Sequence, residues 1–269
     1  MSIKPWQQLT FTDDYMFKLV LLKKDICIRI LERILAINIQ YLDDEKSLKF
    51  RYDSKGIRLD VYTEADGTIY EIEMQVKQLR TEELAKRTRY YQSMIDLDML
   101  KAGCKYKTLK PIFIIFLCTF DPYGQGRHMY TFRNLCVEDS ALEMQDAATK
   151  IFLNSKGTMN DVTPEVKSFL DYLNGILSQD DLVKKIETEI QEVKKDREKE
   201  VSYMTYEMKL DEMREEGHKE GRKEGRREGE NKLARLMSLL LSAGKDQEIR
   251  DMLTNEDLRE QLYLQYNIQ

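Results

Sequence analysis

The sequence predicts an α/β fold in which helices flank a mixed sheet, followed by a long charged helix and a small helical tail. Three observations lead to this prediction. Two runs of alternating residues surround Asp66-Gly67, a continuous apolar run extends from Pro111 to Phe120, and amphipathic segments lie before, between and after them. Alternation is typical of half-buried strands, and a three- to four-residue period is typical of helices.

The composition is that of a globular protein with a surplus of charge. Charged residues make up 34% of the 269 residues, hydrophobic residues make up 42%, and the formal net charge is -5. A net negative charge gives no overall signature of nucleic-acid binding, so any such role depends on local basic clusters. The four cysteines are scattered and there are two histidines, so no zinc site is legible. No apolar signal segment or membrane span is evident, and we expect a cytoplasmic protein that does not contact a membrane.

Residues 13 to 36 are expected to form one amphipathic helix. Thr12 is the expected N-cap, and Asp13 and Asp14 suit the positive end of the helix dipole. One side of this helix carries the apolar residues Met16, Leu19, Val20, Ile26, Ile30 and Ile34.

The stretch Gly56 to Lys77 is expected to form a β-hairpin, because Asp-Gly between two alternating runs is a strong hairpin signal. A two-residue loop sets Ala65 opposite Thr68, Tyr62 opposite Glu71, and Asp60 opposite Glu73. The expected core face carries Leu59, Val61, Tyr70, Ile72, Met74 and Val76. The other face carries Arg58, Asp60, Tyr62, Glu64, Glu71, Glu73 and Gln75.

The acidic face of this hairpin has two interpretations. Side chains directly opposite each other in a sheet lie about 5 Å apart, and like charges there are destabilising. A divalent cation would stabilise Asp60 and Glu73, since Mg²⁺ takes one or two carboxylates and completes its shell with water and phosphate oxygens. The alternative is an ordinary solvated face whose charges are screened.

Residues 80 to 102 are expected to form a second helix, with Leu84, Met94, Leu97 and Leu100 on its apolar face and Gly103 as its stop. The helix also carries basic and aromatic side chains, which can hold a phosphate backbone. The alternative is a solvated face with Tyr90 or Tyr91 packed inward.

The remainder of the first part is expected to complete the sheet. The run Pro111 to Phe120 suits a strand buried on both faces. Further strands are expected over Met129 to Val137 and Lys150 to Asn154, and a helix over Asp161 to Leu177. These elements give a first domain over residues 1 to 180.

The rest of the chain divides into two expected parts. Residues 181 to 230 are expected to form a long charged helix or linker, with a narrow apolar seam and glycines at every fourth position from Gly217 to Gly229. The glycines leave open whether this segment is a marginal helix or a flexible linker, and we favour the helix. Residues 231 to 269 are expected to form a small helical tail, with Gly244 as a helix stop and a capping box from Thr254 to Asp257.

Five stretches of the sequence carry a resemblance to a known family. They are TDDYMFK (12–18), RLDVYTEADGTIYEIEMQ (58–75), RTRYYQ (87–92), KAGCKYKTLKPIFIIFLCTFDPYGQGRHMYTFRN (101–134) and KIFLNSKGT (150–158). Together they resemble the PD-(D/E)XK nuclease-family putative transposases of bacteria, also called recombination-promoting nucleases. The resemblance covers most of residues 1 to 200 and implies a restriction-endonuclease-like fold.

The resemblance implies that Asp60 and Glu73 are the acidic pair of the family's motif, which agrees with the hairpin register. Gln75 stands where the general motif has a lysine. A lysine would help to orient or deprotonate the attacking water, whereas glutamine can position a water but carries no charge. Glutamine is common in this family, and Lys77, two residues further along the same strand face, could substitute in part.

The implied activity is metal-dependent hydrolysis of phosphodiester bonds in double-stranded DNA. Asp60 and Glu73 would bind Mg²⁺ or another divalent cation, with Asp14 as a further candidate ligand, and Gln75 would orient the water. The side chains expected to contact DNA are Arg87, Tyr91 and Gln92.

Two other functions stay open at the level of sequence. The chain could be a non-catalytic DNA-binding or assembly protein on a degenerate nuclease fold, with Gln75 as a mark of decay. It could also be a purely structural coiled-coil partner. A homodimer through the C-terminal helical region is expected.

Overall fold

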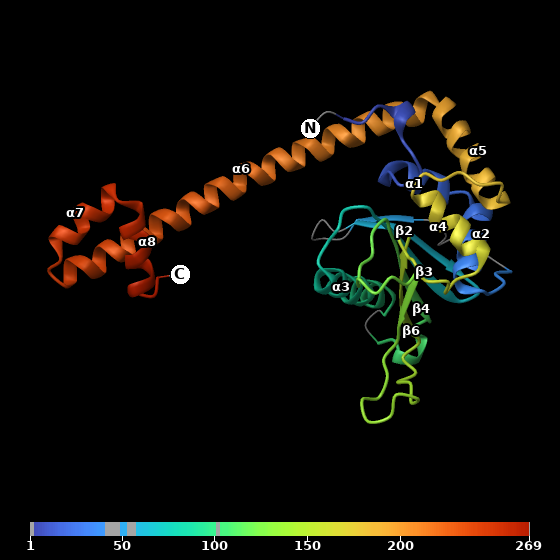
Figure 1. The fold of residues 1–269 in the computed structure, drawn as a ribbon, viewed down its shortest axis with the longest axis horizontal. Coiled ribbons are helices and arrows are strands. Elements are labelled where there is room, and N and C mark those ends of the chain that lie inside the picture. Colours follow the sequence, from blue (N-terminus) through green and yellow to red (C-terminus); the bar gives the residue numbers. More distant parts are fainter. Residues whose placement is uncertain (1–2, 41–48, 53–57, 101–102, 269) are drawn as a thin grey trace. The chain divides into compact units, whose positions relative to one another are not determined.

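The structure is a computed structural model that describes residues 3–40, 49–52, 58–100 and 103–268. The chain divides into two compact units, Met1–Val201 and Ser202–Gln269. The first unit contains the sheet and the second is helical (Figure 1).

The sheet has six strands in the order β1-β2-β3-β4-β6-β5. Neighbours β1–β2, β2–β3 and β5–β6 are antiparallel, whereas β3–β4 and β4–β6 are parallel, so the predicted mixed sheet is confirmed. The strand bounds are Lys49–Tyr52 for β1, Arg58–Ala65 for β2, Thr68–Gln75 for β3, Ile112–Cys118 for β4, Met129–Phe132 for β5 and Ala148–Asn154 for β6.

The hairpin of β2 and β3 has the predicted register. Ala65 pairs with Thr68, Tyr62 with Glu71 and Val61 with Ile72, and the same register carried one step further sets Asp60 opposite Glu73. The turn residues Asp66 and Gly67 both have positive φ, 48° and 74°, as a two-residue type I′ turn requires.

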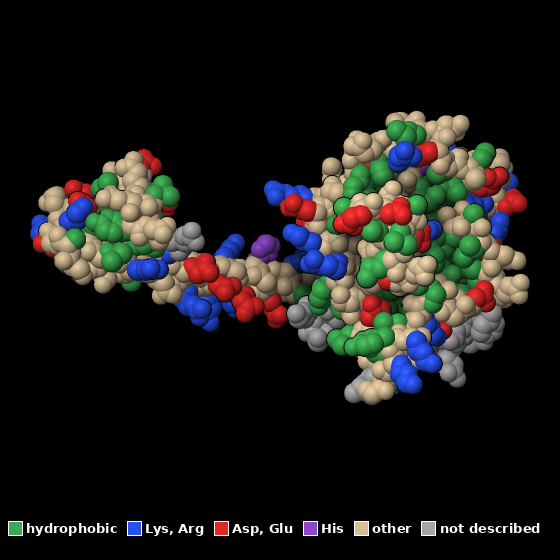
Figure 2. All heavy atoms as spheres, turned by 90° about the horizontal axis from the view of Figure 1, so that it is seen from below, with side chains coloured by type: hydrophobic (Ala, Val, Ile, Leu, Met, Phe, Trp, Pro, Cys, Tyr) green, Lys and Arg blue, Asp and Glu red, His purple; other side chains and the backbone are tan. Residues whose placement is uncertain are grey.

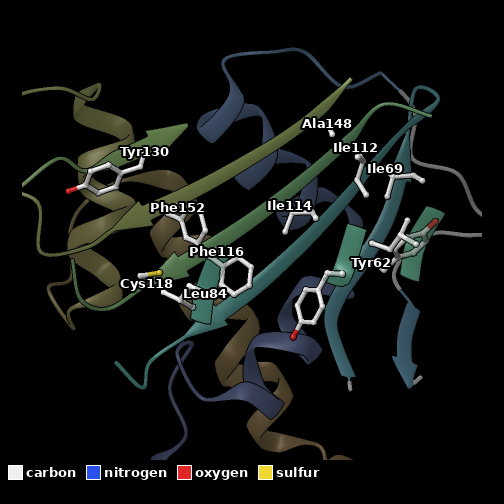
Figure 3. Packing of buried hydrophobic residues seen from close by; sticks show 12 residues of the cluster. Tyr62, Ile69, Leu84, Ile112, Ile114, Phe116, Cys118, Tyr130, Ala148 and Phe152 are labelled. Atoms are coloured by element: carbon white, nitrogen blue, oxygen red, sulfur yellow. The ribbon is translucent and has the colours of Figure 1, made fainter. Parts of the chain in front are cut away.

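The alternative of a solvated hairpin face is wrong, because both faces of the hairpin are buried. Helix α3 (Thr81–Met99) packs over the acidic face, and its Leu84, Tyr91 and Ile95 join a cluster of apolar side chains from the strands (Figure 3). On the predicted core face, Val61, Tyr70, Ile72 and Met74 are buried, but Val76 is exposed because β3 ends at Gln75. The side chains of Arg58 and Leu59 lie outside the described residues. Figure 1 shows α3 on one side of the sheet and α1, α2, α4 and α5 grouped on the other.

The predicted N-terminal helix is two helices, α1 (Asp14–Leu21) and α2 (Lys24–Leu35). The chain breaks at Lys23, whose ψ of 107° is extended, and Asp13 rather than Thr12 is the N-cap of α1. The predicted apolar face remains buried in both helices, except that Leu19 is only partly covered.

The other predicted elements of the first unit are present with different bounds. β4 is buried between β3 and β6, as its continuous apolar sequence predicts. β5 ends at Phe132 rather than Val137, and Leu97 of α3 is 79% exposed rather than buried. The other helices of the first unit are η1 (Trp6–Gln8), η2 (Tyr106–Thr108), α4 (Pro164–Leu173) and α5 (Asp181–Lys195). α6 (Arg197–Ser242) begins in this unit and continues into the second.

The long charged segment is also divided. α5 ends before Asp196, whose ψ of 106° is extended, and α6 begins at the next residue. α5 contacts α1, α2 and α4, so the expected boundary after residue 180 separates helices that the structure packs together. The four glycines of the repeat lie within α6, and the helix interpretation of this segment is confirmed.

The second unit forms a small core of its own. The end of α6 packs with α7 (Asp246–Thr254) and α8 (Glu256–Gln265) through Leu236, Leu240, Ile249, Met252, Leu262 and Ile268. Gly244 ends α6 with a φ of 69°, as predicted, but the N-cap of α8 is Asn255 and not Thr254. Acidic and basic side chains both lie along the surface of α6 (Figure 2). None of the helices in the described part of the chain is long and apolar enough to cross a membrane.

Candidate metal and nucleic-acid site

Three carboxylates of the hairpin are enclosed beneath α3. Asp60 on β2 is 6% exposed, and Glu71 and Glu73 on β3 are 0% and 3% exposed. The Asp60 and Glu73 carboxyl groups lie within hydrogen-bonding reach of each other, and Asp60 Oδ2 accepts a hydrogen bond from the Met74 amide at 3.0 Å. The hairpin therefore brings together the two acidic side chains that the register pairs.

A buried lysine from α1 joins this cluster. Lys18 is 3% exposed, and its Nζ lies 2.8 Å from Asp60 Oδ1 and also pairs with Asp14. Asp14 is near enough to Asp60 to raise its pKa. The structure thus brings the candidate Asp14 to the site, together with Lys18, which is not among the predicted site residues. The sequence feature that points to Lys18 is its four-residue spacing from Asp14, which places both side chains on one helix face.

Arg87 of α3 closes the other side of the cluster. Its Nη1 donates to Gln75 Oε1 at 2.7 Å, and its Nη2 donates to the Tyr91 hydroxyl at 2.7 Å and lies 3.7 Å from Glu73 Oε1. Its guanidinium carbon also lies 5.4 Å from the centres of the Tyr91 and Phe116 rings.

The other predicted DNA contacts are placed differently. Tyr91 is 2% exposed, so the inward-packed alternative describes its position. Gln92 is half-buried and interacts with Asp96 on its own helix. Lys77 lies beyond the end of β3 and is exposed, so it does not share the strand face of Gln75. Its carbonyl accepts a hydrogen bond from Gln75 Nε2.

Burial governs the charge state of the carboxylates. It raises the pKa of Asp60 to about 7, against the lowering effect of its contact with Glu73. The pKa values of Glu71 and Glu73 are also raised well above their ordinary range, first by burial and then by the charge of Asp60. A carboxyl group in such a place needs either a proton or a nearby cation.

The oxygens of this cluster are suited to a divalent cation. Both oxygens of Glu71 and Oε1 of Glu73 are buried without a hydrogen-bond partner among the described residues. Unpaired buried polar atoms of this kind call for an explanation, and the binding of a cation is one. No group of three acidic, histidine or cysteine side chains that could hold a metal occurs in the described part of the chain. A site here would therefore depend on two carboxylates, a number that suits Mg²⁺.

Comparison with known proteins adds one finding. Residues 11–220 match the family model described as PD-(D/E)XK nuclease family transposase. Neither the curated proteins nor the solved structures give a match.

Proposed function

Because the chain belongs to the PD-(D/E)XK nuclease family transposases, we propose that it is an endonuclease that cleaves double-stranded DNA with a divalent cation. Its mixed sheet with flanking helices is the fold of that family. Breaks made in this way would promote recombination, which is the proposed cellular role. Strand transfer is not part of this proposal, since a nuclease core does not supply it.

One observation carries the proposal. Asp60 and Glu73 lie opposite each other on adjacent strands, and their buried carboxyl groups are within reach of each other. Both oxygens of Glu71 and Oε1 of Glu73 have no hydrogen-bond partner among the described residues. Two carboxylates forced together at this cost are unusual in a purely structural hairpin.

In the proposed site Asp60 and Glu73 hold the cation. Asp14, the further candidate ligand, pairs with Lys18 and does not complete a group of three ligands with them among the described residues. When bound, Mg²⁺ or another divalent cation would make a water more acidic and would stabilise the charge that develops on the phosphate. Lys18 holds Asp60 from one side, and Arg87 holds Glu73 from the other. The charged side chains of Lys18 and Arg87 fix the orientation of the two carboxylates. Helix α3 covers Glu71 and excludes bulk water from it.

Cleavage of supercoiled plasmid DNA tests the proposal. With Mg²⁺ or Mn²⁺ we expect the wild type to nick or linearise the plasmid, and Asp60→Ala to lower the rate by roughly a hundredfold or more, because a ligand is lost. Glu83→Gln is the matched control, since it removes an exposed carboxylate of α3 away from the cluster. Equal background cleavage by the wild type and Asp60→Ala would contradict the proposal.

A second candidate function rests on a different observation. Asp60 is paired with Lys18, and both polar ends of the Gln75 amide are engaged within the protein. A degenerate nuclease that only binds DNA would show these features as well. DNA band shifts without any cation-dependent cleavage would favour this alternative.

A further inference from the structure

Gln75 occupies the strand position where the general motif of its family has a charged side chain. It is 7% exposed, its Oε1 accepts from Arg87 at 2.7 Å, and its Nε2 donates to the Lys77 carbonyl. Both polar ends of the amide are therefore used inside the protein. Gln75 is placed to hold Arg87 rather than to contact a water or a substrate directly.

Arg87 is held in one orientation by several groups. Gln75 and Tyr91 accept from its two terminal nitrogens, Glu73 lies 3.7 Å away, and the rings of Tyr91 and Phe116 flank it. A planar guanidinium can satisfy such a fixed set of partners, whereas an ammonium cannot. Its side chain is nonetheless 31% exposed, so a ligand can reach it from solvent.

We propose that Arg87 supplies the fixed positive charge at the scissile phosphate that residue 75 lacks, and that Gln75 is a positioning residue for Arg87. A guanidinium has five N–H donors, so two hydrogen bonds within the protein leave capacity for phosphate oxygens. This inference rests on the proposed nuclease function for its substrate, and it assigns to Gln75 a role other than orienting water.

The positioning role is tested by a double-mutant cycle in plasmid cleavage. We expect Gln75→Leu and Arg87→Met each to lower the rate roughly tenfold to a hundredfold, and the double variant to be no slower than Arg87→Met alone, because Gln75 acts through Arg87. Arg87→Lys keeps the positive charge but not the planar arrangement of N–H donors, and it is expected to lower the cleavage rate about tenfold. Melting temperatures of all variants show whether they are folded.

The phosphate contact is tested without any metal. Binding to a duplex oligonucleotide in EDTA is measured over a range of salt concentrations, and each phosphate contact contributes about 0.9 to the slope of log K against log salt. We expect Arg87→Met to reduce this slope by about one, and Gln75→Leu to reduce it by less. Arg89→Met is the control, since Arg89 is an exposed arginine of the same helix.

Each outcome supports or overturns one part of the proposal, either the positioning role of Gln75 or the phosphate contact of Arg87. A Gln75→Leu penalty that persists in full in the Arg87→Met background overturns the positioning role. An unchanged salt slope in Arg87→Met overturns the phosphate contact. A changed slope in a protein that cleaves nothing supports the Arg87 contact while the proposed function fails. A wild-type chain that binds no duplex DNA overturns both.

Discussion

At the scale of single residues, Glu71 lies in an environment that disfavours a negative charge. It is fully buried, neither of its oxygens has a hydrogen-bond partner among the described residues, and burial raises its pKa well above the ordinary 4.5. Arg87 is the favourable charge nearby, while Asp60 opposes ionisation. In the absence of a bound cation, the folded protein therefore keeps a proton on this cluster that the unfolded chain has released.

This proton makes stability depend on pH with a definite sign. A raised carboxyl pKa in the folded state means that stability falls as pH rises from about 4.5 towards the folded-state pKa. Each unit of difference is worth about 1.4 kcal/mol. In EDTA, we expect Glu71→Gln to lose less free energy of unfolding between pH 5 and pH 8 than the wild type does.

Urea denaturation at the two pH values measures this difference. The cost of burying the glutamine amide is the same at both pH values, so it cancels from the comparison. Asp98→Asn, at an exposed position near the end of α3, serves as the control for removing an acidic group. An identical loss of stability in Glu71→Gln and the wild type would show that Glu71 is ionised throughout.

The sequence predicts part of this cluster because the relevant contacts are local. The Asp-Gly turn fixes the hairpin register, and the register alone sets Asp60 beside Glu73. The contact of Arg87 with Gln75 depends instead on how α3 docks on the sheet, which no spacing in the sequence specifies. The burial of the acidic face was missed for the same reason, since a strand that alternates in polarity normally leaves its polar face in water.

At the scale of elements, the continuous apolar run of β4 and the hairpin alternation predict their strands well. The breaks within the predicted helices were missed, because neither proline nor glycine marks them. At the second break, Asp196 has a recognisable role once the structure is known. Its Oδ1 accepts from the Glu198 and Lys199 amides and so caps the start of α6.

The glycine repeat of α6 gives a prediction about helix stability. No atom lies within 4 Å of the Cβ that alanine would add at Gly217, Gly221, Gly225 or Gly229, apart from the helix's own backbone. Each glycine costs about 1 kcal/mol relative to alanine in a helix. We expect replacement of all four by alanine to slow hydrogen exchange across residues 217–229 at least tenfold in the full-length chain.

A glycine in the sheet unit provides the opposite control. At Gly157 an added Cβ would lie 2.5 Å from the His128 ring, so Gly157→Ala is expected to lower the melting temperature. Unchanged exchange in the four-alanine variant would mean that α6 gains nothing from helix propensity, as for a segment already fixed by a partner.

At the scale of the whole molecule, the division of the chain depends on α5. The sequence suggests a boundary after residue 180, because the composition shifts there. In the structure five apolar side chains of α5 are buried, and the helix contacts α1, α2 and α4. The buried residues are Leu182, Val183, Ile186, Ile190 and Val193. We therefore propose a nuclease unit that includes α5, and a homodimer formed through the helical region after it.

Two truncated chains test the proposed extent of the nuclease unit and the proposed dimer. Burying an apolar side chain of this size contributes about 1.5 to 3 kcal/mol, and a domain is stable by only about 5 to 15 kcal/mol in total. A chain ending at residue 180 loses five such side chains and exposes the surfaces that they cover. We expect it to be unfolded or insoluble, whereas a chain ending at Val201 melts cooperatively and cleaves DNA.

Light scattering is expected to show the 201-residue chain as a monomer and the full-length chain as a dimer. A full-length monomer at high concentration would contradict dimerisation, and a cooperatively folded 180-residue chain would show that α5 is dispensable to the sheet unit.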